Sequence, residues 1–100
     1  MNVAAARAFI LKKLSTELPS DLFYHGVHHT LDVTGSALVI AGQEGIKDQV
    51  QIDLLETAAL YHDCGFIYTY EGHEEEGCRV VKETLPEFGY SMDHIEVICG

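Results

Sequence analysis

Basic residues are scarce in this sequence, which has six Lys and Arg side chains against sixteen Asp and Glu and a formal net charge of −10. A surface with this charge repels the phosphate backbone of DNA and RNA, so we expect no nucleic-acid polymer as a partner. The same charge opposes a phosphorylated substrate, unless a bound cation reverses the sign of the local field.

Long apolar runs, C-x-x-C pairs, repeats and linkers are also absent. No run approaches the roughly 20 residues that span a bilayer, so we expect no membrane association. The widely spaced Cys64, Cys78 and Cys99 suggest neither a zinc ribbon nor a redox dithiol; reduced thiols in a cytoplasmic protein are the simplest interpretation. A length of 100 residues, 47% of them hydrophobic, predicts one folded domain over residues 1–100.

Apolar residues recur every three or four positions in the first half of the chain, which predicts two amphipathic helices. Before Pro19 the stripe consists of Val3, Ala6, Ile10, Leu14 and Leu18. The second stripe, which stops near Gly42 and Gly45, consists of Val27, Leu31, Thr34, Leu38 and Ala41.

The second half of the chain predicts three more helices. Asp48 and Gln51 resemble a capping box before a helix whose stripe is Ile52, Leu55, Ala59 and His62. Gly65 is placed to end that helix, and GFIYTYEG at 65–72 is expected to be a loop whose aromatic rings fold onto the core.

A fourth helix is expected over residues 73–85, closed by Pro86, and Ser91 suits the N-cap of a fifth. The chain reaches IEVICG only two turns into that last helix, so we expect the domain to be incomplete at its C-terminus. If it is complete, exposed Ile95 and Ile98 favour a homodimer. The prediction is a compact all-α bundle of about five helices.

Histidine is concentrated in YHGVHHTLDV at 24–33. His25 and His29 are four residues apart and share a helix face, whereas His28 points elsewhere and suits an exposed pair with Asp32. Histidine serves near neutral pH as a proton carrier or as a metal ligand. These residues alone do not distinguish that chemistry from ordinary helix packing.

A second candidate is the His62–Asp63 dipeptide. His62 falls in register with the apolar stripe of its helix, so its side chain is expected to point inward, with Asp63 beside it. Buried polar groups need partners, because an unpaired one costs about 1–3 kcal/mol. A satisfied core histidine with a capping aspartate explains this pair as well as a metal site does.

Three segments together resemble the HD superfamily of metal-dependent phosphohydrolases: YHGVHHTLDV at 24–33, LLETAALYHDCGF at 54–66 and HEEEGCRVVKETLPEFGY at 73–90. The resemblance implies an HD-type bundle in which His29, His62 and Asp63 bind a divalent metal. It also implies that Asp63 orients a metal-activated water and that His25 protonates the leaving oxygen. His73 resembles a residue that holds a second metal or lies near the phosphate.

Two departures from the family pattern bear on activity. The family's last metal ligand is an Asp on a later helix, and Asp93 comes too early to match it. Many relatives also place His or Lys where this chain has Phe66, so one contact to the substrate phosphate is missing. Arg79 or Lys82 could replace that contact, although both are expected to be solvated.

The resemblance implies hydrolysis of a phosphomonoester or phosphodiester in a small substrate such as a nucleotide. Fe, Mn, Zn, Ni and Co suit His and carboxylate ligands, and Mg²⁺ suits them less well. The alternative is a catalytically inactive HD-like regulatory or sensory module that binds metal or nucleotide. A helical interaction domain with coincidental histidines fits the spacing least.

Overall fold

The computed structural model describes residues 1–19 and 26–100. In these ranges the chain forms α-helices and short 3₁₀ helices and contains no β-strand, which confirms the predicted all-α fold. The elements are α1 (Val3–Glu17), α2 (Val27–Gln43), α3 (Gln49–Tyr61), η2 (Cys64–Ile67), α4 (His73–Thr84), η3 (Leu85–Phe88) and α5 (Met92–Cys99).

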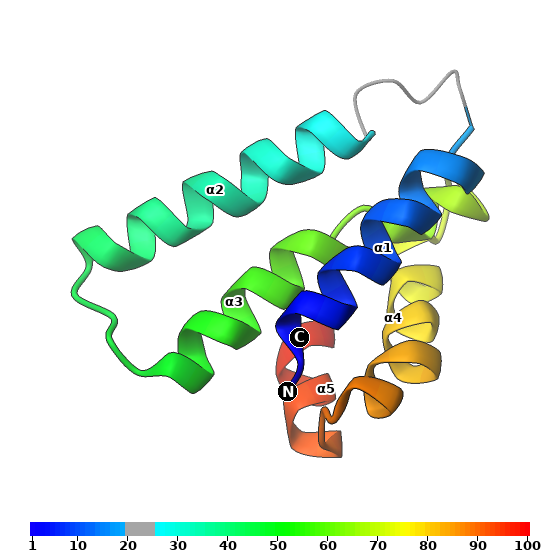
Figure 1. Cartoon of the computed structure of the whole chain (residues 1–100). Coiled ribbons are helices and arrows are strands. Elements are labelled where there is room, and N and C mark those ends of the chain that lie inside the picture. Colours follow the sequence, from blue (N-terminus) through cyan, green and yellow to red (C-terminus); the bar gives the residue numbers. More distant parts are fainter. Residues whose placement is uncertain (20–25) are drawn as a thin grey trace.

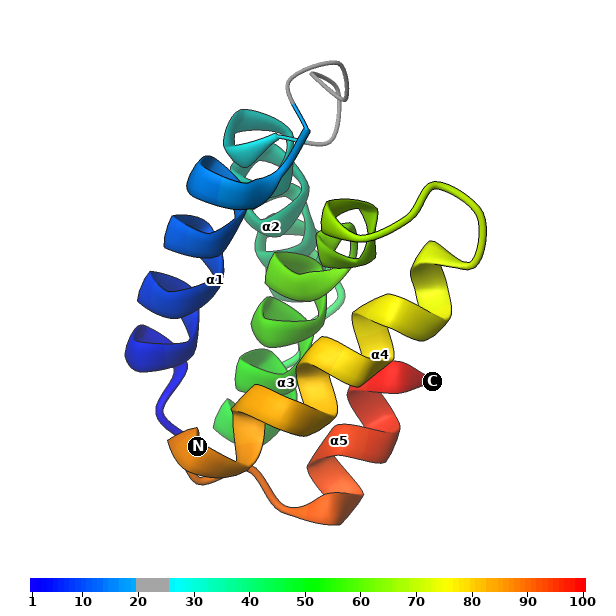
Figure 2. The ribbon, with the colours of Figure 1, turned by 90° about the vertical axis from the view of Figure 1, so that its right-hand side faces the viewer.

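Helix α3 occupies the centre of the bundle, in contact with α1, α2 and α5 (Figures 1 and 2). Helix α2 runs along α3, and α4 packs against η2, η3 and α5. Because α3 has neighbours on several sides, it buries Thr57, Ala59, Leu60 and Tyr61 rather than a single stripe. None of the described helices combines the length and apolar character that crossing a bilayer requires.

The hydrophobic core lies between α1, α3, α4 and α5. Its buried members are Ala6, Ile10, Leu14, Leu60, Tyr61, Cys64, Val80, Val81, Leu85, Tyr90 and Ile95. The α1 stripe of the sequence prediction supplies the first three of these. Each large aliphatic side chain buried here contributes roughly 1.5–3 kcal/mol to folding.

The predicted stripe of α2 is partly wrong. Its buried residues are Thr30, Thr34 and Ala41, whereas Leu31 is 40% exposed. The Thr34 hydroxyl donates to the Thr30 carbonyl at 2.8 Å, so the helix itself satisfies one of the two buried hydroxyls. The predicted stripe correctly contains Thr34 and Ala41 but misses Thr30, because a threonine can present its methyl group to the core like valine.

Helix α3 begins where the sequence predicts, because the Asp48 side chain accepts the Val50 N–H at 3.0 Å. Helix α5 also begins as predicted, with Ser91 as N-cap. His94 completes this cap: its N–H donates to the Ser91 hydroxyl at 3.2 Å, and its Nδ1 accepts the Ser91 N–H at 3.0 Å.

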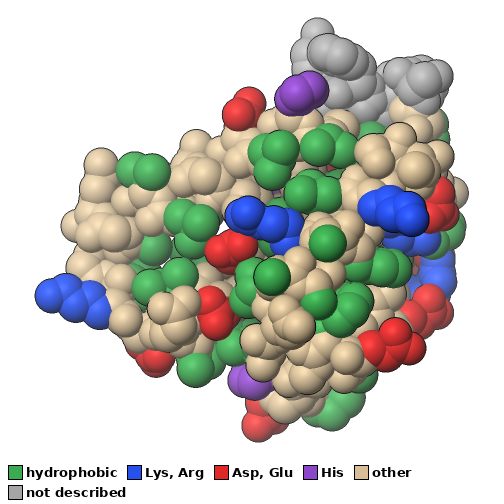
Figure 3. All heavy atoms as spheres, viewed as in Figure 1, with side chains coloured by type: hydrophobic (Ala, Val, Ile, Leu, Met, Phe, Trp, Pro, Cys, Tyr) green, Lys and Arg blue, Asp and Glu red, His purple; other side chains and the backbone are tan. Residues whose placement is uncertain are grey.

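The expectation that Ile95 is exposed is wrong. Ile95 is 2% exposed and belongs to the core, and Ile98 packs partly against it. The exposed apolar side chains of α5 are Met92 at 68% and Val97 at 63%. Figure 3 shows that apolar side chains on one face of the molecule are dispersed in small groups. A homodimer through Ile95 and Ile98 therefore loses its structural basis.

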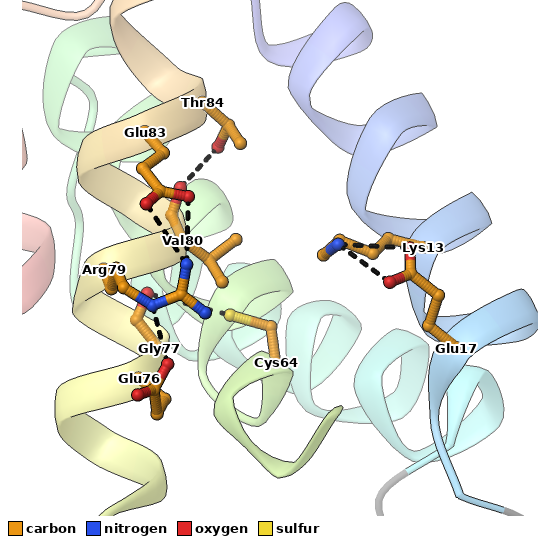
Figure 4. A network of polar contacts seen from close by, with 9 residues as sticks. All are labelled: Lys13, Glu17, Cys64, Glu76, Gly77, Arg79, Val80, Glu83 and Thr84. Carbon is orange, nitrogen blue, oxygen red and sulfur yellow. Dashed lines mark hydrogen bonds and ion pairs between the residues drawn. The ribbon is translucent and has the colours of Figure 1, made fainter. Parts of the chain in front are cut away.

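Charged side chains on α1 and α4 gather near the exposed ring of Tyr68, which follows η2. The Lys13 Nζ lies 5.3 Å from the ring centroid and the Arg79 Cζ 4.5 Å. Arg79 also pairs with Glu76 at 2.7 Å and Glu83 at 3.1 Å, and Lys13 pairs with Glu17 (Figure 4). Arg79 is therefore engaged by acidic neighbours on its own helix.

Candidate metal centre

Three predicted ligands meet where the N-terminal part of α2 approaches the C-terminal end of α3. His29 lies in the first turn of α2, and His62 and Asp63 directly follow α3. One ligand atom from each residue lies within 4.8 Å of the others. The sequence separates His29 from the other two by more than thirty positions, so the packing of α2 on α3 creates the cluster.

The two distances from Asp63 fit donors that share one ion. The Asp63 Oδ2 lies 3.1 Å from the His62 Nε2 and 3.4 Å from the His29 Nε2. Metal–nitrogen and metal–oxygen bonds to these groups are about 2.0–2.2 Å long, so two donors on one ion are roughly 3.0–3.5 Å apart. Two imidazole nitrogens and a carboxylate are a donor set for divalent transition ions.

The backbone orients the His62 ring. Its Nδ1 lies 2.6 Å from the Ala59 carbonyl oxygen, so the N–H of Nδ1 donates there and Nε2 keeps its lone pair for a ligand role. The prediction of an inward His62 is wrong, because its side chain is 31% exposed. His62 is the C-cap of α3, where the chain turns into η2 and leaves the apolar stripe.

Asp63 is the buried member of the cluster. Its side chain is 10% exposed, whereas that of His29 is 42% exposed. A carboxylate at this depth is costly unless it is paired or coordinates a cation. The Nε2 atoms of His62 and His29 lie 3.1 and 3.4 Å from its Oδ2, so a cation bound by these three groups would provide that compensation.

Gly65 allows α4 to approach this turn closely. A Cβ at Gly65 would lie 1.6 Å from the His73 carbonyl oxygen and 2.9 Å from the Gly77 nitrogen. The expectation that Gly65 ends the preceding helix is wrong, since α3 ends at Tyr61. The residue is glycine because the backbone of α4 occupies the space of a side chain.

A family model for the HD domain matches residues 26–99, from the residue before α2 to the last residue of α5. This chain belongs to the HD domain family. No curated protein and no solved structure matches it. The match includes His29 and the His62–Asp63 pair, so the resemblance found in the sequence and the cluster in the structure coincide.

His73 of this HD domain lies outside the three-residue cluster. Its ring stacks on Phe66, with centroids 4.0 Å apart and planes inclined by 15°. The N–H of its Nδ1 faces the Tyr70 carbonyl oxygen at 3.1 Å, and its Nε2 lies 3.9 Å from a Glu74 carboxylate oxygen. Its expected contact with a second metal or a phosphate stays a prediction.

Phe66 lies in η2 and is 6% exposed, so one aromatic ring of GFIYTYEG folds onto the protein as predicted. Tyr68 and Tyr70 are instead 45% and 68% exposed. The predicted loop is also shorter than expected, because its first residues form the 3₁₀ helix. Position 66 therefore carries a packed aromatic ring in place of a cationic side chain.

The remaining candidates take no part in the described cluster. His25 lies outside the described residues. Asp93 lies in the first turn of α5, and among residues 1–19 and 26–100 the metal-ligand cluster consists of His29, His62 and Asp63. Sequence reasoning missed two supporting features, the Ala59 carbonyl and Gly65. The glycine two residues after Asp63 was a signal for the second.

Proposed function

We propose that this HD domain binds a divalent transition-metal ion through His29, His62 and Asp63 and hydrolyses a phosphomonoester or phosphodiester. The substrate class is a small phosphorylated molecule such as a nucleotide. Iron, manganese, zinc, nickel and cobalt suit the donor set. Family membership supports the reaction class.

The convergence of three donor atoms within 4.8 Å carries the proposal. A protein with a net charge of −10 repels a phosphate unless a cation offsets the field at the site. A metal ion bound there supplies that positive charge and an activated water at neutral pH. The cluster therefore addresses both the electrostatic and the chemical requirement of phosphoester hydrolysis.

The residues have distinct roles in this proposal. His62 is a fixed ligand, because the Ala59 carbonyl oxygen lies 2.6 Å from its other ring nitrogen. Asp63 is the anionic ligand and accepts a hydrogen bond from the attacking water, which orients the water toward phosphorus. His25 donates a proton to the leaving oxygen, a role that rests on the family resemblance alone.

A non-catalytic HD module that binds metal or nucleotide is the second candidate. The described part of the chain supplies three side chains to the cluster, without the later Asp that is the family's last metal ligand. Buried Phe66 also stands where many relatives have a cationic side chain that contacts the substrate phosphate. Arg79, one proposed substitute, is engaged by Glu76 and Glu83. These observations favour metal binding without turnover.

Metal content and phosphatase activity of the same samples separate the two candidates. The protein is purified without chelator or an affinity-tag metal, and its metal content is measured by elemental mass spectrometry. Asp63→Asn and His62→Ala are compared with His28→Ala, which changes an exposed histidine beside His29 that is outside the cluster. Hydrolysis is followed with aryl phosphomonoesters and phosphodiesters and with a nucleotide panel.

We expect near-stoichiometric metal in the wild type and in His28→Ala, at least tenfold less in the two cluster variants, and hydrolysis only in the metal-loaded forms. Stoichiometric metal without hydrolysis of any substrate supports the non-catalytic module. A wild-type protein that binds none of the five ions after incubation at neutral pH would refute the metal-dependent hydrolase and the metal-binding form of the second candidate.

A further inference from the structure

Cys78 on α4 and Cys99 on α5 face each other across the interface between these two helices. The Cys78 Sγ lies 3.8 Å from the Cys99 carbonyl oxygen, and the Cys99 Sγ lies 4.0 Å from the Cys78 carbonyl oxygen. The reciprocal contacts place both sulfur atoms in the same small volume. Figure 2 shows the C-terminal end of α5 next to α4.

The thiol of Cys99 interacts with that of Cys78 directly. Burial and, to a smaller extent, a hydrogen bond with the Cys78 thiol together raise the pKa of Cys99 to about 11. Both residues are only half-buried, and both are free cysteines. They therefore combine proximity with access, the two requirements for forming a disulfide.

Access comes through a cavity of about 140 Å³ between α3, α4 and α5. Cys78, Cys99, Glu74 and the metal-ligand candidate His62 all contribute to its lining. A small oxidant fits a cavity of this size, whose volume exceeds that of several water molecules. The thiol pair and His62 thus face one shared space.

Cys64 provides a natural contrast within the same chain. It is fully buried, and its thiol faces the Gly77 carbonyl oxygen at 3.8 Å, as Figure 4 shows. Burial raises its pKa to about 12. A buried, protonated thiol is inert toward oxidants, so Cys64 is not expected to take part.

We propose that Cys78 and Cys99 form an oxidative modification site, in which a hydroperoxide converts the two thiols into a reversible intramolecular disulfide. The Cys78 sulfur attacks the peroxide, and the thiol proton passes to the leaving oxygen. The O–O bond breaks, and Cys78 becomes a sulfenic acid while water or an alcohol leaves.

The Cys99 sulfur then attacks the sulfenic sulfur, so the S–S bond forms, the S–O bond breaks and a second water leaves. The two cysteines lose two electrons in total and the peroxide gains two. A dithiol reductant reverses the modification by thiol–disulfide exchange. The disulfide covalently joins α4 to α5 beside the cavity that His62 lines.

Peptide mapping tests the site directly. The reduced full-length protein is treated with hydrogen peroxide, free thiols are alkylated, and the sample is digested without reductant. A glutamate-specific protease separates the three cysteines, since it cuts after Glu71, Glu76, Glu83 and Glu96. Mass spectrometry then identifies which peptides are joined.

We expect a crosslink between the Cys78 and Cys99 peptides that a dithiol removes, with Cys64 alkylated only after unfolding. The thermal midpoint of the oxidised protein should rise by roughly 10–25 °C, because the bond closes a loop across 21 positions. Cys64→Ser should keep both effects, and Cys99→Ser and Cys78→Ser should abolish them.

Absence of this crosslink in folded wild-type protein, under peroxide that oxidises its methionines, overturns the proposal. A crosslink that involves Cys64, or one that joins two molecules, overturns it as well. The result is independent of the metal site, since neither the crosslink nor the thermal midpoint requires metal or phosphatase activity.

Discussion

Replacing Gly65 with alanine tests the close approach of α4 to the turn that carries the HD pair. The added Cβ would lie 1.6 Å from the His73 carbonyl oxygen, whereas a carbon–oxygen contact requires about 3.3 Å. The two groups must therefore separate by about 1.7 Å. The carbonyl carbon of His73 at 2.6 Å and the Gly77 nitrogen at 2.9 Å also obstruct the Cβ.

These obstructing atoms belong to the backbone of α4, so no side-chain rotation relieves the clash. Overpacking of a core typically costs about 1–3 kcal/mol, and a backbone clash lies at or above the upper end of that range. We expect Gly65→Ala to lower the free energy of unfolding by about 3 kcal/mol or more. In a domain of this size, that corresponds to a fall in the thermal midpoint of roughly 10–20 °C.

Gly77→Ala is the matched control, because Gly77 lies on the other side of the same contact. A Cβ at Gly77 would meet the Gly65 nitrogen at 3.7 Å and the Cys64 Sγ at 3.8 Å, which are ordinary contacts. Gly77 lies inside α4, where alanine is favoured over glycine by about 1 kcal/mol. We therefore expect this variant to be about 0.5–1 kcal/mol more stable than the wild type.

Urea unfolding followed by far-UV circular dichroism measures both variants. The two substitutions add the same methyl group to the same interface, so the expected opposite signs isolate the steric effect from any general effect of alanine. A Gly65→Ala protein as stable as the wild type would refute the close approach of α4. The position of α4 relative to the HD pair would then need revision.

Three further predictions concern a hydroxyl, a phenol and the metal. Thr30→Val should stabilise the protein by about 1 kcal/mol, because the buried Thr30 hydroxyl has no hydrogen-bond partner among the described residues. Thr34→Val should destabilise it by about 1 kcal/mol, because it removes the hydrogen bond to the Thr30 carbonyl. Burial raises the pKa of Tyr61 to about 12. The resulting stability of about 2–3 kcal/mol is fully present below pH 10 and should be lost as the pH rises from 10 to 12. The loss of stability over this range should be smaller in Tyr61→Phe. Saturating Mn²⁺ should raise the thermal midpoint of the wild type but not of Asp63→Asn, and a chelator should reverse the rise.

Each of these has a defined check. Chemical unfolding of the two threonine variants should give changes of opposite sign, and equal changes would contradict the assignment of an unsatisfied hydroxyl to Thr30. For the phenol, equal pH dependence of wild type and Tyr61→Phe above pH 10 would contradict the burial argument. A thermal shift by Mn²⁺ that survives in Asp63→Asn would place the ion elsewhere.

The sequence determined most of the helical architecture, because local physics decides it. Periodic apolar residues predicted α1, and side-chain caps at Asp48 and Ser91 predicted the starts of α3 and α5. Each of these signals depends only on residues a few positions apart. They form wherever the rest of the chain lies. The His-Asp motif could likewise be recognised from residue types and spacing, and the three donors meet as that motif predicts.

Tertiary packing determined the exposure of the residues for which the sequence prediction was wrong. His62 lies beside a partly open turn because α3 ends at Tyr61, and Leu31 is exposed because α2 presents two threonines to its neighbours. Ile95 is buried because α3 and α4 cover α5. In each case the number and placement of neighbouring helices determine burial, and the residue's own helix contains no such information.

Long-range contacts decided the remaining features. Gly65 was expected to end a helix, but its significance is the α4 backbone that occupies the space of its missing Cβ. Cys78 and Cys99 are separated by 21 positions and carry no short-range redox signature, yet the packing of α5 on α4 brings their thiols together. Local interactions along the chain therefore determine where these capped helices begin, whereas only the packed bundle determines which side chains meet.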